Sequence, residues 1–200
     1  EASYKKAITL KSDYANAYNN LGITLKKLGR LEDSKNHLKK AIELKPDFAE
    51  AFCNLGDTLC ILNELEESKK MLLQAILFKR QYANAYSNLG VTLKQLGRLD
   101  ESVANLNKAI ALKPSFFEAY NNLGVTLSEQ GKWQESLLSF KKAIEIKYNY
   151  SDAYNNMSTV LLELGKLDEA VINYKKAIIF KPKIAETHNN LGNILKEMDK

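Results

Sequence analysis

The 200-residue chain holds few of the residues that carry redox or metal chemistry, with two cysteines, two histidines and one tryptophan. Cys53 and Cys60 are seven residues apart, which on one helix is about 10 Å along the axis and too far for a disulfide. His37 and His188 belong to other predicted helices, away from both thiols. We therefore predict free thiols in a reducing, cytoplasmic compartment, with neither a metal site nor a cofactor.

Long apolar segments and catalytic motifs are also missing. No run reaches the roughly 18 to 20 apolar residues that span a bilayer, and the polar segment 1–10 lacks the apolar core of a signal peptide. We expect no membrane partner. No nucleophile, base and acid recur together, and no glycine-rich phosphate loop is present. We therefore predict that the chain is not an enzyme.

Arginine is scarce in a chain that is otherwise basic. The net charge is +5 and the pI about 9.0, values that would suit a nucleic-acid ligand. Only Arg30, Arg80 and Arg98 are arginines, however, and the other 26 of the 29 basic residues are lysines. Recognition of phosphates and bases by paired hydrogen bonds favours arginine, whereas lysines late in helices complement the helix dipole. We predict solvated helix ends and no nucleic-acid partner.

Asparagine, by contrast, recurs every 34 residues without exception. The six residues are Asn20, Asn54, Asn88, Asn122, Asn156 and Asn190. A fixed period of this length is typical of solenoids built from helical hairpins, in which each repeat buries its apolar face against its neighbours. Because asparagine is a mediocre helix former, its recurrence inside a helix indicates a role other than folding.

The same period predicts a single solenoid of five complete repeats with a partial repeat at each end. Apolar or small residues recur at helical spacing twice in each repeat, which indicates two amphipathic helices. The predicted fold class is therefore all-α, built from antiparallel helix pairs. The complete repeats span 15–48, 49–82, 83–116, 117–150 and 151–184, while 1–14 supplies a second helix and 185–200 a first helix.

Turn and cap residues mark the expected helix boundaries. Gly29 and its equivalents occupy the turn inside each repeat, where Asn63 is a tolerated replacement. At three junctions between repeats, Asp47, Ser115 and Asn149 have side chains of the N-cap type. We expect these three residues to cap the first helices that follow them.

Proline ends the second helix in only some repeats. Pro46, Pro114 and Pro182 stand at this place, whereas Arg80 and Tyr148 replace proline in two repeats. Because proline restricts the residue before it to extended conformations, we expect a less sharp bend at the two junctions that lack it.

In this pattern the chain resembles the tetratricopeptide repeat family over essentially its whole length. The resemblance implies a right-handed superhelix whose first helices line a concave groove and whose second helices form the convex outside. The asparagine series is also similar to that in the superhelix of O-linked N-acetylglucosamine transferase. The residues of the first complete repeat that match the signature of the tetratricopeptide repeat family are Tyr18, Leu21, Gly22, Leu25, Ser34, Leu38, Ala41 and Pro46.

The asparagines occur on the side of the first helix that lies opposite its apolar arc, at about 100° per residue. We therefore expect these six residues, named the asparagine ladder, to face the groove. Asn19, Cys53 and Asp57 are expected in the same lining. The neighbours predicted to bind peptide with the ladder are Asn16, Lys27, Asn84, Lys94, Glu118 and Asp152.

An asparagine amide can pair with both the N–H and the C=O of an extended peptide without reading its side chains. We predict an interaction scaffold that binds an extended protein segment, with six rungs holding about 12 to 15 residues. Four alternatives stay open. The asparagines could bridge neighbouring helices, or they could persist because the repeats arose by recent duplication. The chain could be the substrate-recognition part of a larger enzyme such as a glycosyltransferase, or solenoids could self-associate end to end.

Overall fold

The computed structural model describes residues 1–198 and places them in twelve α-helices, with no strand in that range. The predicted all-α fold of antiparallel helix pairs is confirmed. The last two residues of the predicted partial repeat 185–200 lie outside the described residues. The helices are α1 (Ala2–Leu10), α2 (Ala15–Lys27), α3 (Leu31–Leu44), α4 (Ala49–Ile61), α5 (Leu65–Phe78), α6 (Ala83–Gln95), α7 (Leu99–Leu112), α8 (Phe117–Glu129), α9 (Trp133–Ile146), α10 (Ser151–Glu163), α11 (Leu167–Phe180) and α12 (Ala185–Met198).

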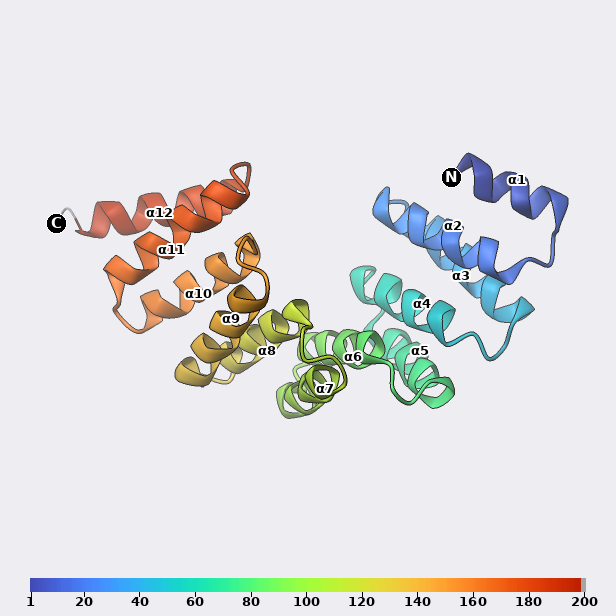
Figure 1. The fold of residues 1–200 in the computed structure, drawn as a ribbon, viewed down its shortest axis with the longest axis horizontal. Coiled ribbons are helices and arrows are strands. Elements are labelled where there is room, and N and C mark those ends of the chain that lie inside the picture. Colours follow the sequence, from blue (N-terminus) through green and yellow to red (C-terminus); the bar gives the residue numbers. More distant parts are fainter. Residues whose placement is uncertain (199–200) are drawn as a thin grey trace. The chain divides into compact units, whose positions relative to one another are not determined.

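The chain divides into two compact units, Glu1–Leu112 with α1 to α7 and Lys113–Lys200 with α8 to α12. Within each unit a first helix packs against the second helix of its own repeat, as α4 does on α5 and α10 on α11 (Figure 1). The sequence predicts a single solenoid and gives no sign of this division, because the junction 113–116 has the same lysine, proline and final phenylalanine as 45–48. None of the described helices combines the length and hydropathy needed to cross a bilayer.

A left-handed residue ends the first helix of each complete repeat. Gly29 has a φ of +76°, and the N–H of Arg30 donates to the carbonyl of Leu25 at 3.0 Å, a bond that satisfies one of the last helical carbonyls. Asn63 takes the same conformation with a φ of 62°. The prediction that asparagine replaces glycine in this turn is confirmed, since asparagine is among the few residues that tolerate a positive φ.

In four of the five complete repeats the two helices come into close contact at a glycine of the first helix. A Cβ placed on Gly56 would lie 2.5 Å from Leu72 Cγ in α5. The hydroxyl of Ser68, which is fully buried, donates to the carbonyl of Gly56 at 2.7 Å. The same bond joins Ser102 to Gly90 and recurs in the C-terminal unit. A missing side chain and a buried hydroxyl therefore set the distance between the paired helices.

The predicted N-caps are wrong by one residue. The first helices α4, α8 and α10 have an aromatic residue at the N-cap, such as Phe48, and none of these caps forms a side-chain hydrogen bond. The Phe48 N–H instead donates to the carbonyl of Lys45, whose ammonium group lies 4.8 Å from the centre of the Phe48 ring. This lysine and aromatic pair recurs at Lys79 with Tyr82, at 4.7 Å. A backbone turn and a cation–π contact replace the predicted cap.

The expectation of a less sharp bend without proline is also wrong. Lys79, before Arg80, has a φ of −139° and a ψ of 87°, while Lys45, before Pro46, has −140° and 91°. In both cases the lysine N–H donates to a helical carbonyl four residues earlier, at 3.0 Å. The lysine and aromatic junction therefore forms the turn by itself, and proline only reinforces it.

Because the paired helices are in close contact at Gly56, we predict that alanine at this position destabilises the protein, the reverse of its effect in most helices. In most helices alanine is more stable than glycine by about 0.5 to 1 kcal/mol. At Gly56, however, the new Cβ would overlap a branch atom of Leu72 and lie 3.2 Å from the carbonyl of Ser68. We expect Gly56→Ala to lower the free energy of unfolding by about 1 to 3 kcal/mol, measured by urea denaturation.

Gly192 in α12 provides the matched control, because a Cβ at this helical glycine meets no described atom within 4 Å. Gly192→Ala should leave the free energy of unfolding unchanged or raise it by up to about 1 kcal/mol. Equal responses at the two glycines would contradict the role given to the close contact.

Candidate functional site

All six ladder asparagines are half-buried at the same place in their first helices. The amides of Asn54, Asn88 and Asn156 connect neighbouring first helices inside their units. In the N-terminal unit, Asn54 Nδ2 donates to Asn19 Oδ1 at 2.9 Å, and in the C-terminal unit Asn156 Nδ2 donates to Asn121 Oδ1 at 3.1 Å. The residue just before a ladder asparagine is therefore the acceptor for the ladder asparagine of the next repeat.

The acceptor residues are not part of the exposed lining that the sequence predicts. Asn19 is 6% exposed and Cys53 is 2% exposed. The Cys53 sulfur accepts a hydrogen bond from Asn88 Nδ2 at 3.6 Å. The expectation was wrong for these residues because neighbouring first helices pack at this position, which a helical projection of a single repeat does not reveal.

The bridge occupies only part of each ladder amide. An asparagine side chain has two N–H groups and an oxygen with two lone pairs. The bond from Asn54 to Asn19 uses one N–H, which leaves the second N–H and the oxygen of Asn54 for a ligand. At Asn20 the oxygen accepts a weaker bond from Asn19, at 3.4 Å, and keeps a second lone pair. The amides of Asn54, Asn88 and Asn156 are thus held in place through one N–H, and each keeps a second donor and its oxygen.

The predicted neighbours of the ladder are distributed along the first helices. Four of them lie in the first turns of first helices: Asn16, Asn84 and Asp152 are exposed there, and Glu118 is half-buried. Of the two lysines, Lys27 is exposed at the end of α2 and Lys94 is half-buried in α6. Lys181 Nζ lies 3.6 Å from Asp152 Oδ1. In the second repeat Glu50 takes the same place, and its hydrogen bond to Lys79, at 2.8 Å, lowers the pKa of this carboxyl group. Two of these first-turn acids therefore already have cationic partners.

Two further pairs connect first helices in the N-terminal unit. Lys26 in α2 forms an ion pair with Asp57 in α4, and the Cys60 thiol donates to Gln95 Oε1 at 3.1 Å. The polar residues of this face therefore hold neighbouring repeats together as well as facing solvent.

In the C-terminal unit, the ladder residue Asn156 lines a cavity of about 260 Å³ between first helices. Phe140 reaches its wall from the second helix α9. Tyr174 in α11 is fully buried, and its hydroxyl lies 3.1 Å from Thr159 Oγ1 beside the cavity. Neither aromatic residue is predicted from the sequence as part of this face, although each replaces a leucine such as Leu38. The full lining is Val125, Ser128, Phe140, Asn155, Asn156, Thr159, Val160 and Glu186.

Four family models match the chain. A model described as TPR repeat matches residues 92–131 and 159–199, and models described as tetratricopeptide repeat match 15–48, 37–70 and 118–147. Together they cover well over half of the chain. The chain belongs to the tetratricopeptide repeat family. Members of this family generally mediate protein–protein interactions.

Comparison with curated proteins gives no match, whereas solved structures match over most of the chain. TTC0263, a thermophilic TPR protein in Thermus thermophilus, is 20% identical, with coverage of 90% of this chain and 98% of that chain and a TM-score of 0.80. YrrB, described as a TPR protein with an unusual peptide-binding site, is 24% identical, with coverage of 94% and 96% and a TM-score of 0.64. At these identities the likeness shows the fold.

Because the Cys53 thiol is buried, we predict that the protein loses stability at alkaline pH as this thiol ionises. Burial raises the pKa of this thiol to about 12 from its ordinary value of 9.0. A raised pKa means that this contribution to stability is fully present below about pH 9 and is lost as the pH rises toward about 12. Between about pH 8 and pH 10, the wild type should lose about 1 kcal/mol more free energy of unfolding than a Cys53→Asn variant.

Asparagine is chosen because Asn19 and Asn121 occupy the equivalent positions. Both proteins are denatured with urea at the two pH values in the presence of a reductant. Buried tyrosines away from Cys53, such as Tyr150, titrate alike in both proteins and cancel in the difference. Burial and Cys53 both raise the pKa of Tyr82, so any change at Tyr82 is part of the effect of the substitution. Identical pH dependence would contradict the shift assigned to Cys53.

Proposed function

We propose that the first-helix face binds an extended peptide segment and that the asparagine ladder holds its backbone. One observation carries the proposal: the ladder amides are half-exposed at one place in every repeat, and the bridge from each of Asn54, Asn88 and Asn156 uses a single N–H. The remaining donor and acceptor match the C=O and N–H that an extended chain presents.

Repeat spacing fits this ligand. Neighbouring packed helices are about 8 to 10 Å apart, and an extended peptide advances about 3.3 Å per residue. Each rung would therefore meet roughly every third residue of the peptide, and the three rungs of one unit would cover about six to eight residues. YrrB, which shares the fold, is described as having a peptide-binding site, in agreement with a ligand of this class.

Backbone hydrogen bonds give a modest and sequence-tolerant affinity. Each contributes only about 0.5 to 1.5 kcal/mol net, while association and ordering cost several kcal/mol. Preference among peptides must therefore come from the neighbours of the ladder. Lys27 and Asn84 are exposed in the N-terminal unit, whereas Asp152 is exposed in the C-terminal unit. The two units would accordingly favour different side chains on the bound segment.

A second role for the ladder is favoured by the bridges themselves. Because Asn54 and Asn88 each connect two first helices, the asparagines could serve only to hold neighbouring repeats in register. The two roles predict different losses on substitution, so one set of variants separates them.

The test uses a peptide selected from a random display library on the wild-type protein. Replacing Asn54 and Asn88 together by alanine should weaken its binding about tenfold or more, because up to four peptide hydrogen bonds are lost. The free energy of unfolding should fall by only about 1 to 2 kcal/mol, since each bridge is one partly exposed hydrogen bond. Fluorescence anisotropy and urea denaturation measure the two effects.

Asn107→Ala is the matched control, because Asn107 is exposed on the second helix α7. It should change neither binding nor stability. N-methylation of the peptide backbone at every third residue should weaken binding more than alanine substitution of its side chains. Unchanged binding of the Asn54 and Asn88 variant, with a stability loss of several kcal/mol, would assign the ladder to helix bridging instead.

A further inference from the structure

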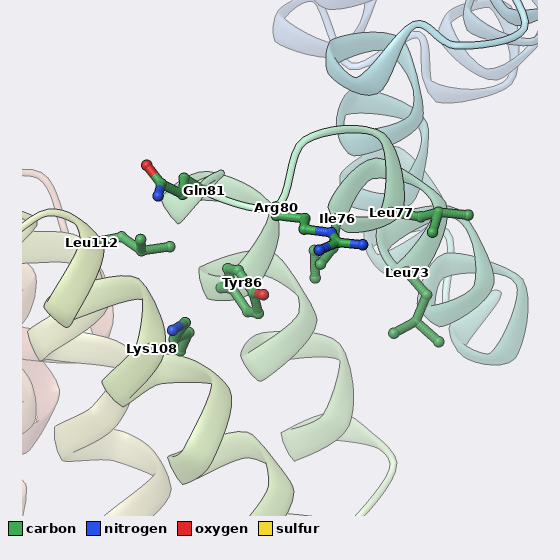
Figure 2. A pocket seen from close by; sticks show the side chains of 8 residues that line it. All are labelled: Leu73, Ile76, Leu77, Arg80, Gln81, Tyr86, Lys108 and Leu112. Carbon is green, nitrogen blue, oxygen red and sulfur yellow. The ribbon is translucent and has the colours of Figure 1, made fainter.

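A cavity away from the asparagine ladder lies between the second helices α5 and α7 of the N-terminal unit. Its volume is about 620 Å³. Figure 2 shows its side chains, with Tyr86 of α6 between those of α5 and α7. The lining consists of Leu73, Ile76, Leu77, Arg80, Gln81, Tyr86, Lys108 and Leu112. We name it the α5–α7 pocket.

Two leucines of this pocket are not required by the fold. Leu73 is 49% exposed and Leu77 is 62% exposed, so neither belongs to the core. In the first and fourth complete repeats the position of Leu73 holds lysine, and that of Leu77 holds glutamate. The helices form with charged residues at both places. The two leucines of the second repeat therefore add an exposed apolar surface that packing does not explain.

Arg80 also departs from the pattern of the other repeats. It occupies the position of Pro46, Pro114 and Pro182, although the residue before it has the conformation found before Pro46. The turn therefore accepts proline, and the Arg80 N–H takes part in none of the backbone hydrogen bonds of the described turns. The arginine places a guanidinium group in the pocket instead.

The pocket is also basic. Arg80 and Lys108 are both exposed, and neither forms an ion pair with another described residue. No acidic side chain is among the eight residues of the lining. Two cations beside a leucine-lined surface complement a ligand that carries carboxylates next to large apolar side chains.

We propose that the α5–α7 pocket docks an amphipathic protein helix with leucine-like side chains on one face and acidic residues beside them. The groove between two second helices suits a helix, which buries apolar residues spaced three and four apart. Contacts with Leu73, Leu77 and Leu112 would supply the buried apolar area, and Arg80 and Lys108 would pair with the acids. This interaction is independent of peptide binding on the first-helix face.

Other occupants fit the pocket less well. A second copy of this chain carries a net charge of +5 and would bring like charge to a basic pocket. A nucleic acid would satisfy Arg80 and Lys108 but would leave the leucines against phosphates and sugars. The acidic amphipathic helix satisfies both kinds of residue.

The experiment measures binding of two labelled helical peptides by fluorescence anisotropy. Both carry leucine on one face, and the other face carries glutamate in one peptide and lysine in the second. The glutamate peptide should bind the wild type at least about tenfold more tightly than the lysine peptide. The double variant Leu73→Lys with Leu77→Glu keeps the net charge of the protein and installs the pair found in two other repeats, so it should fold normally. It should bind the glutamate peptide at least about tenfold more weakly than the wild type.

Arg80→Pro is the second variant, and it should bind the glutamate peptide about three- to tenfold more weakly while keeping the circular dichroism of the wild type. The variant with Asn54 and Asn88 replaced by alanine should bind it as the wild type does, which separates this site from the ladder. Equal affinity for the two peptides, or full affinity in the leucine double variant, would overturn the proposal. So would a concentration-dependent dimer in sedimentation that the same double variant abolishes, because the occupant would then be a second copy.

Discussion

The close contact between paired helices is the constraint on which the rest of the structure depends. At Gly56 the backbone of α4 lies against Leu72, and Ser68 donates a buried hydrogen bond to the glycine carbonyl. A helix held this closely on one side cannot rotate about its axis without overlap. Its opposite side is therefore fixed as well, and the ladder asparagines appear at the same place in each first helix.

The bridges explain how a helix-disfavouring residue can serve both folding and binding. The Asn54 amide spans two repeats through one N–H, which orients the side chain and reduces the conformational entropy lost when a ligand binds. The exposed remainder can then act as a preorganised donor and acceptor. Helix bridging and the proposed peptide binding would thus use different atoms of the same side chain. The α5–α7 pocket differs from the ladder because its leucine pair, Leu73 and Leu77, occurs in one repeat only.

The sequence alone predicts the helices, the turn inside each repeat and the equivalence of Asn63 with glycine, since these depend on local conformation and periodicity. The predictions from the sequence are wrong where contacts outside the local pattern determine the start of a helix or the burial of a side chain. Asp47 has the chemistry of an N-cap, yet the backbone turn made by Lys45 and Phe48 shifts the helix start. Asn19 has a polar side chain on the predicted exposed arc, yet contact between repeats buries it.

The aromatic residues at leucine positions and the α5–α7 pocket also could not be predicted from the sequence. Tyr174 follows the pattern of a buried leucine, and only its position beside Thr159 reveals that its hydroxyl reaches the first-helix face. Leu73 and Leu77 stand where two other repeats have lysine and glutamate, but only the structure shows that both are exposed in a pocket with Arg80. For Tyr174 the missing information is the identity of the neighbouring helix.

The central claim is that the ladder amides keep one donor and one acceptor for a peptide backbone. Nuclear magnetic resonance of the asparagine side-chain amides tests it most directly, with a display-selected peptide added stepwise to the labelled protein. We expect the amide signals of ladder residues such as Asn54 and Asn88 to shift on binding, while those of Asn36 and Asn107 on second helices stay in place. Saturated peptide binding with unmoved ladder signals would contradict it.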